Sequence, residues 1–208
     1  DEWLLLGWSA CAPTDAHEYL HNIPSEKIGA FIFEPGGSGS AFVKFPPKPL
    51  VQAIVERVKQ AGGLLMTNEI TTGMGRTGRW FGFQHYDIQP DIVALGKGLG
   101  NGYPVSAVAL RQDLAEKLEA GGFHYAQSHQ NDPLGCAVAK EVITVLREEN
   151  LIERGNSVGG TFLEQLRRLG EKHALVKEAR GRGMLLGVEL HPHANFSVSA
   201  AYRALLDK

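Results

Sequence analysis

The sequence has few cysteines, almost no net charge and no long apolar run, and each of these features excludes a class of protein. Only two cysteines occur in 208 residues, Cys11 and Cys136, and they form no Cys-x-x-Cys pair. We therefore expect free thiols in a reducing compartment rather than a disulfide framework. A formal net charge of −2 gives no argument for nucleic acid or a membrane surface as a partner. The apolar runs are too short to span a bilayer, and the sequence predicts a cytoplasmic globular protein.

Both ends of the sequence indicate that it is part of a longer chain. The start, DEWLLLGWSA, does not begin with Met and lacks the basic region of a signal peptide. The end, SVSAAYRALLDK, has an amphipathic helical pattern with no cap and no following strand. We therefore expect residues to be missing at both termini.

Apolar runs that alternate with a helical pattern predict an α/β fold with a mostly parallel sheet. Residues 28–34 (IGAFIFE) form a continuous apolar run, which is typical of a strand buried on both faces. Residues 47–63 repeat apolar side chains at helical spacing, and residues 64–69 (LLMTNE) form the next strand. Strand, helix and strand at this spacing predict a βαβ unit. Two more strands are expected at residues 91–96 and 105–110.

After these strands the chain changes character. Helices are predicted at residues 113–120, 133–150 and 152–173, and a strand of alternating character at residues 184–190. We place a domain boundary near Asn150. Residues 1–150 would form a large domain, incomplete at its N-terminus, and residues 151–208 part of a small α+β domain.

Unusual side chains occur where three predicted strands end, namely Glu34, the pair Asn68-Glu69, and Lys97. In open parallel sheets the ligand binds beyond the carboxyl ends of the strands. One charged residue at a strand end is usually a solvated terminus. Three such ends at one edge, each followed by glycines, favour a ligand site.

Two glycine-rich stretches imitate nucleotide-binding motifs without their structural context. Gly73-x-Gly75-x-x-Gly78 matches the dinucleotide fingerprint, but residues 79–91 do not have the pattern of the helix that this fingerprint must open. Lys97 is followed by Gly98 rather than Ser or Thr, so it does not belong to a P-loop. A lysine at the end of a buried strand is either a surface residue in a turn or, if desolvated, a nucleophile toward a carbonyl.

Two further groups of polar residues, a histidine pair and an arginine pair, give no strong indication of a functional site. His191 and His193 form a His-x-His pair without an obvious third ligand, so we expect no metal site. Arg180 and Arg182 are expected in a turn that leads into the last strand, although a role near a substrate carboxylate stays open.

Four stretches in order resemble the class III aminotransferases. They are EPGGSG at residues 34–39, the block at residues 64–110, DPLGCAVA at residues 132–139 and RGRGMLLGVEL at residues 180–190. The resemblance covers nearly the whole chain after Ile28. It implies the pyridoxal phosphate (PLP)-dependent transferase fold of type I, a homodimer with shared active sites, and transfer of an amino group from an amino acid or amine to an oxo acid. The family's upstream phosphate loop, its stacking aromatic and its downstream arginine are not in this sequence.

The resemblance assigns roles residue by residue. Lys97 stands where the family has the lysine that forms a Schiff base with PLP and then moves the proton. Asn68 replaces the aspartate that bonds the pyridine nitrogen. Ile70 stands where an aliphatic side chain packs under the ring, and Thr71 where many members have a glutamine near the phenolic oxygen.

Three other positions complete this assignment. Ser128 stands where the family has a threonine that reaches the phosphate of the partner's cofactor. Glu34 matches the glutamate of the family's Glu-Pro pair. Gly39 occupies the position of a second glutamate in ω-amino acid transaminases, which makes ornithine or 4-aminobutyrate a less suitable substrate.

Asn68 is the main departure from the family pattern. An aspartate keeps the ring nitrogen protonated so that the ring can act as an electron sink, whereas an amide supplies no charge. Either this subfamily tolerates the amide, or the reaction is slower, altered or lost. From the sequence alone we expect Asn68 to donate to an unprotonated ring nitrogen. A PLP-dependent isomerase or racemase and a non-catalytic PLP-binding homologue remain as alternatives.

Overall fold

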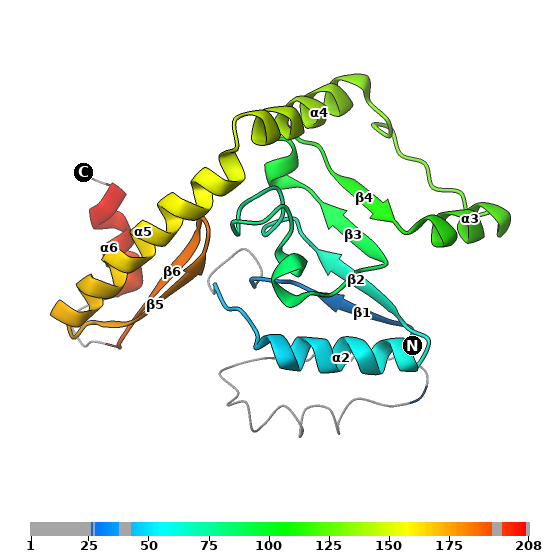
Figure 1. Cartoon of the computed structure of the whole chain (residues 1–208). Helices are drawn as coiled ribbons and strands as arrows, with labels where there is room; N and C mark the ends of the chain where they lie inside the picture. The colour runs from blue at the N-terminus through cyan, green and yellow to red at the C-terminus, as the bar shows by residue number, and fades with distance from the viewer. Residues whose placement is uncertain (1–25, 27, 38–42, 193–196, 207–208) are drawn as a thin grey trace.

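The computed structural model describes residues 26, 28–37, 43–192 and 197–206 (Figure 1). Its larger sheet has four strands in the order β1-β2-β3-β4, and these are Ala30–Phe33, Leu64–Asn68, Ile92–Leu95 and Ala107–Leu110. β1, β2 and β3 are parallel, and β4 is antiparallel to β3. The predicted α/β fold with a mostly parallel sheet is confirmed.

The direction of β4 follows from the segment that precedes it. Residues 96–106 contain only the short 3-10 helix η3 (Lys97–Leu99). A parallel return would need a crossover of a dozen or more residues, usually with a helix. The chain therefore folds back, and Leu95 pairs with Ala107.

One face of the sheet is covered by α2 (Lys48–Gln60), which has a proline in its first turn. Proline suits that position because the first amides of a helix have no intrahelical partner. The buried side of α2 consists of Leu50, Val51, Ile54, Val55 and Val58. After α2 the chain turns at Gly62, whose φ of +77° lies in a region that favours glycine.

The main apolar cluster joins α2, the sheet and the 3-10 helix η2 (Gly82–Tyr86). It contains Phe33, Val51, Val55, Leu65 and Tyr86. Leu65 and Tyr86 have no solvent-exposed surface. The Tyr86 ring meets the Phe33 ring edge to face at 5.0 Å, and its hydroxyl donates to the Pro35 carbonyl.

The prediction that residues 28–34 are buried on both faces is wrong for the described part of the chain. Ile32 is 47% exposed, whereas its neighbour Phe33 is 6% exposed. α2 covers one face of β1, and no described segment covers the other. Every residue of β4 is exposed, so no described segment covers either face of this strand.

The remaining elements follow the sheet in sequence. They are α3 (Gln112–Ala120), α4 (Pro133–Glu148), α5 (Leu151–Lys172), β5 (Val176–Arg182), β6 (Leu185–Leu190) and α6 (Val198–Leu206). β5 and β6 form a separate antiparallel hairpin that lies along α5 (Figure 1). The chain passes from α4 to α5 through Asn150, which has a left-handed backbone. A domain boundary at this residue stays a prediction.

The expected turn at Arg180 and Arg182 is wrong, because both arginines lie inside β5. The reversal falls one residue later, at Gly183, which has a φ of +54°. Gly181 does not turn the chain, since it pairs with Leu186 across the hairpin.

The glycine-rich loop at residues 73–78 is a packing surface for α5 and the β5–β6 turn. A Cβ atom on Gly75 would lie 2.6 Å from Ile152, and one on Gly78 would lie 2.2 Å from the Asn156 side chain. A Cβ atom on Gly183 would lie 2.3 Å from the Gly78 nitrogen. Contacts this close exclude any side chain. These glycines thus allow the C-terminal elements to approach the end of β2.

This packing predicts that Gly78→Ala lowers the free energy of unfolding by about 2 kcal/mol or more, because the substitution adds a clash to a φ of +81°. Gly160→Ala is the matched control. Gly160 lies within α5 with open space around its Cα, so alanine should stabilise the helix by about 0.5–1 kcal/mol. Urea unfolding measures both. Equal midpoints for Gly78→Ala and the unchanged protein would show that the loop does not dock.

Candidate active site

The carboxyl ends of β1, β2 and β3 bring Glu34, Asn68 and Lys97 to one edge of the sheet. The three strands are parallel neighbours, so their last residues lie side by side. The register pairs Phe33 with Thr67, which places Glu34 beside Asn68 one step further along. The expected convergence of these strand ends is confirmed, whereas a ligand site at this edge stays a prediction.

The Asn68 amide is held at both of its ends. Its nitrogen Nδ2 donates to Glu34 Oε1 at 2.7 Å, and its oxygen Oδ1 accepts from the Ile70 backbone N–H at 3.2 Å. A backbone N–H can only donate, so the oxygen must face Ile70 and the nitrogen must face the carboxylate. The amide orientation is fixed by these two partners together.

Lys97 follows β3 and has a φ of +42°, an uncommon conformation for a residue with a side chain. Its Nζ donates to the Thr71 hydroxyl at 3.0 Å. A Cβ atom on Gly96 would lie 3.6 Å from Ile70, which places Ile70 next to the lysine backbone. Lys97 is exposed, so the described residues form no desolvated pocket around its amine.

Glu69 is directed away from this edge. Successive side chains of a strand point to opposite faces, and Glu69 is buried with 1% of its surface exposed. Its carboxylate accepts from Thr72 Oγ1 at 2.6 Å and from the backbone N–H groups of Gly82 and Phe83 at 2.8 Å each. The sequence analysis grouped Glu69 with Asn68. Because neighbouring side chains of a strand point to opposite faces, the two residues could have been assigned to different faces from the sequence.

Burial dominates the electrostatics of Glu69. Desolvation raises the pKa of its carboxyl, and the hydrogen bonds from Thr72, Gly82 and Phe83 partly oppose that shift. Three donors on one carboxylate connect the end of β2 to η2. Glu69 is thus a structural residue that shapes the loop between them.

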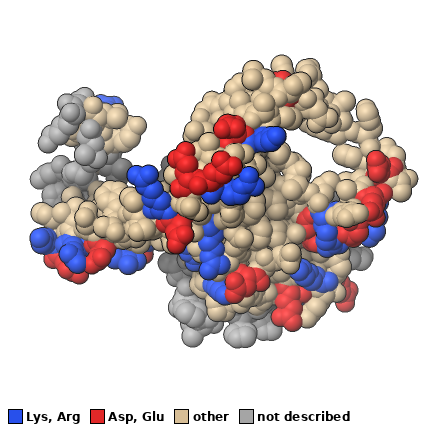
Figure 2. Space-filling model, turned by 45° about the horizontal axis from the view of Figure 1, so that its top comes forward, with Lys and Arg blue, Asp and Glu red and all other residues tan. Residues whose placement is uncertain are grey.

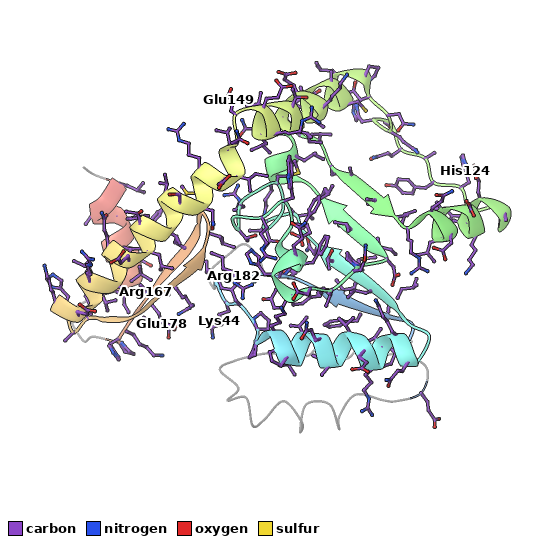
Figure 3. The ribbon with its side chains drawn as sticks, in the orientation of Figure 1. Lys44, His124, Glu149, Arg167, Glu178 and Arg182 are labelled. Atoms are coloured by element: carbon purple, nitrogen blue, oxygen red, sulfur yellow. The ribbon has the colours of Figure 1, made fainter. Side chains whose placement is uncertain are left out.

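Arg182 and Lys44 lie where the β5–β6 hairpin faces the larger sheet and α2 (Figure 3). The Arg182 guanidinium carbon is 4.5 Å from the centre of the Phe45 ring and 5.1 Å from that of Tyr86. Burial raises the pKa of Tyr86 to about 12. Burial also lowers the pKa of His85, and the positive charge of Arg182 adds to this effect.

Arg180 is engaged in structural contacts. Its guanidinium pairs with Glu178 and Glu189 at 2.8 Å each and also donates to the Val43 carbonyl. Local pairs of this kind agree with Figure 2, which shows lysine and arginine interspersed with aspartate and glutamate on the face drawn. A role for Arg182 toward a carboxylate stays a hypothesis.

Among the assigned residues that the structure describes, Ser128 is the one that lies away from the sheet edge. It belongs to the segment 121–132 between α3 and α4, which stands away from β4 as an arch (Figure 1). Ser128 is exposed, as are Phe123 at 62% and Tyr125 at 59%. Within the part of the chain that the structure describes, this arch has no covering element.

Two cavities are found near the sheet. One of about 280 Å³ is bordered by β1, Glu34, Lys44 and the start of α2. The other, of about 630 Å³, is bordered by α2 and residues 87–89. Neither of these two cavities is lined by Asn68 or Lys97, and of the strand-end residues only Glu34 borders one of them.

The described residues contain no group of three or more His, Cys, Asp or Glu side chains placed to hold a metal ion. His193, Gly39 and Cys11 lie outside these residues. Cys136 has a free, exposed thiol. None of the helices described is long and apolar enough to cross a membrane.

Comparison with known proteins places the chain in a family. Residues 8–207 match the family model for class III aminotransferases. The chain is 40% identical to acetylornithine aminotransferase of Methanopyrus kandleri over 165 residues, which cover 79% of this chain and 41% of that protein. It is 38% identical to ornithine aminotransferase 1 of Staphylococcus aureus (strain COL) over 178 residues, which cover 85% of this chain and 44% of that protein.

Solved structures show the same fold. An aminotransferase of Bacillus anthracis superimposes with a TM-score of 0.82 and 31% identity, over 94% of this chain and 49% of that one. Ornithine aminotransferase of Toxoplasma gondii, whose structure has PLP at partial occupancy in its active site, gives a TM-score of 0.71 and 38% identity over 78% and 38% of the two chains. The chain thus spans less than half the length of these proteins, and its fold is that of the type I PLP-dependent transferases.

The buried Glu69 carboxylate generates a prediction on stability. Glu69→Gln should lower the free energy of unfolding at pH 7 by about 2 kcal/mol, because an amide cannot accept from every donor now bonded to the carboxylate. The exposed Glu56→Gln is the control and should change stability by less than about 0.5 kcal/mol.

The pH dependence has a defined sign. The pKa of Glu69 is raised in the folded state above 4.5, so the folded protein binds the proton more tightly than the unfolded chain. The unfolding free energy of the unchanged protein relative to Glu69→Gln should therefore increase as the pH falls from 7 toward 4.5. Urea titrations at several pH values measure it. A difference that shrinks instead would mean that the three hydrogen bonds outweigh desolvation.

Proposed function

This chain belongs to the class III aminotransferase family, and on that premise we propose that its protein is a PLP-dependent aminotransferase. It would move an amino group from an amino acid or amine donor to an oxo acid. The observation that carries the proposal is the pair of groups at adjacent strand ends, the Lys97 amine bonded to Thr71 and the fixed Asn68 amide. No observation favours an isomerase or a non-catalytic homologue.

The groups at the sheet edge have the chemistry that PLP requires. A primary amine is exposed between two glycines, so a bulky ligand can approach the backbone. The Asn68 amide keeps one Nδ2 hydrogen and one Oδ1 lone pair beyond the bonds to Glu34 and Ile70, and either can meet a ring nitrogen. When bound, PLP supplies a reactive carbonyl and an electron-withdrawing ring.

Each residue then has a role. The Lys97 amine would hold PLP covalently, and its free form would carry the transferred proton at Nζ. Thr71 Oγ1 accepts from that amine and fixes its position. Ile70 lies beside Gly96 and would pack against the ring, while Asn68 would orient the ring nitrogen.

We propose a homodimer with shared active sites. Ser128 lies on the exposed arch rather than at its own strand edge, so it is free to reach the cofactor phosphate of a partner. The aromatic rings of Phe123 and Tyr125 are more than half exposed on the same arch. Exposed aromatic groups of this kind are enriched at protein interfaces.

The first test identifies the cofactor lysine in the complete protein. Borohydride reduction in the presence of PLP, followed by peptide mapping, should place the label on Lys97, because its amine stands at the sheet edge beside Asn68 and Thr71. Lys97→Ala should lose the label and transamination, measured in a coupled oxo-acid assay. Lys140→Ala, at an exposed lysine of α4, should keep both. A label on another lysine with Lys97 unmodified would disprove the assignment.

The second test concerns the shared site. Ser128→Ala should weaken PLP binding in the homodimer by roughly tenfold, since one hydrogen bond to a charged group is lost. In a mixed dimer of a Ser128→Ala chain with a Lys97→Ala chain, both defects should fall in one site and leave the other intact. Equilibrium dialysis should then show half of the sites with the original affinity. A mixed dimer without any intact site would place Ser128 in its own chain's site.

A further inference from the structure

The amide that replaces the family's aspartate is bonded to a carboxylate. Glu34 Oε1 accepts from Asn68 Nδ2 at 2.7 Å, and both side chains are only partly exposed. The contact follows from the sheet, because β1 and β2 are adjacent and parallel with Phe33 opposite Thr67. A negative charge therefore lies one hydrogen bond behind the group that would meet a cofactor ring.

This contact changes what Asn68 can do. The sequence alone predicted that a neutral amide would donate to an unprotonated ring nitrogen. Oδ1, however, has two lone pairs, and the Ile70 N–H uses only one, at 3.2 Å. The other can accept from a protonated ring nitrogen, with the Glu34 charge on the far side of the amide as its counter-charge.

We propose that Glu34 is a positioning residue that acts through Asn68, fixing the amide orientation and supplying the negative charge that keeps the ring nitrogen of bound PLP protonated. The inference rests on the proposed function. In this chain the negative charge that serves the ring nitrogen would lie on Glu34, after β1, and not at the end of β2. The presence of Asn68 in place of the family's aspartate would then not by itself weaken the PLP ring as an electron sink.

The other charged groups near this edge do not replace Glu34. Glu69, the nearest other carboxylate along the chain, is bonded to Thr72 and to two backbone amides on the opposite side of the strand. Lys97, after β3, and Lys44, which borders the cavity next to Glu34, are positive and would favour a neutral ring. In the described part of the chain, Glu34 is the carboxylate in contact with Asn68.

A neutral ring nitrogen, expected from the amide alone, and the protonated ring nitrogen proposed here differ by one proton. This proton can be observed directly. The complete protein is loaded with PLP that carries ¹⁵N in its ring, and the ¹⁵N chemical shift is followed as a function of pH. The unchanged protein should show a protonated ring nitrogen at neutral pH. In Glu34→Gln the oxygen acceptor remains but the charge is lost, so the pH at which the ring loses its proton should fall by about one to three pH units.

Two further variants separate charge from structure. Glu56→Gln, which removes an exposed glutamate of α2, should leave the ¹⁵N titration unchanged. Asn68→Asp combined with Glu34→Gln should restore the protonated ring, because a carboxylate then meets the ring nitrogen itself. If Glu34 had only a structural role, Glu34→Gln would not shift the ¹⁵N titration, and adding Asn68→Asp would not restore it.

The outcomes that would overturn the inference are distinct. A loaded, unchanged protein with a neutral ring nitrogen would disprove it without any variant, as would a titration that is the same in Glu34→Gln. Both results would leave the proposed function intact. A complete protein that takes up no PLP would disprove the proposed function, and this inference with it.

Discussion

The arrangement of the site depends on the hydrogen bonds that the buried Glu69 carboxylate accepts. It is buried, and it bonds to Thr72 and to the amides of Gly82 and Phe83. These bonds anchor the loop that leaves β2. Because side chains alternate along a strand, the anchor on one face sets the direction of Asn68 on the other. A single strand end therefore carries a structural carboxylate and a ligand-facing amide in consecutive positions.

The loop at residues 73–78, which follows β2, is also the surface on which the C-terminal elements pack. Its glycines allow α5 and the β5–β6 turn to approach closely. A Cβ atom on Gly75 or Gly78 would collide with α5, and one on Gly183 in the turn would collide with the loop. The docking surface of the C-terminal elements is thus continuous with the segment that carries Ile70 and Thr71. Within that segment, the Thr71 hydroxyl accepts from the Lys97 amine.

The strand edge is open in the described residues, in contrast to the enclosed core beneath α2. Lys97 and Ser128 are exposed, and Ile32 and Val108 present apolar surface on β1 and β4. The chain spans less than half the length of its relatives. An edge of this kind agrees with a site that is completed by further segments and by a second subunit, as proposed for the arch that carries Ser128.

The sequence by itself determined the strands and helices up to α5, the mostly parallel sheet, and the convergence of Glu34, Asn68 and Lys97 at one edge. It could do so because apolar periodicity and the direction of each strand along the chain are local properties. Only the tertiary structure decided the partners of these residues. The bond between Glu34 and Asn68 joins positions 34 residues apart, and no local pattern encodes it. For the same reason the close contacts of the glycine loop, the strand position of Arg180 and Arg182, and the exposed faces of β1 and β4 could not be predicted, since each depends on which distant segment packs there.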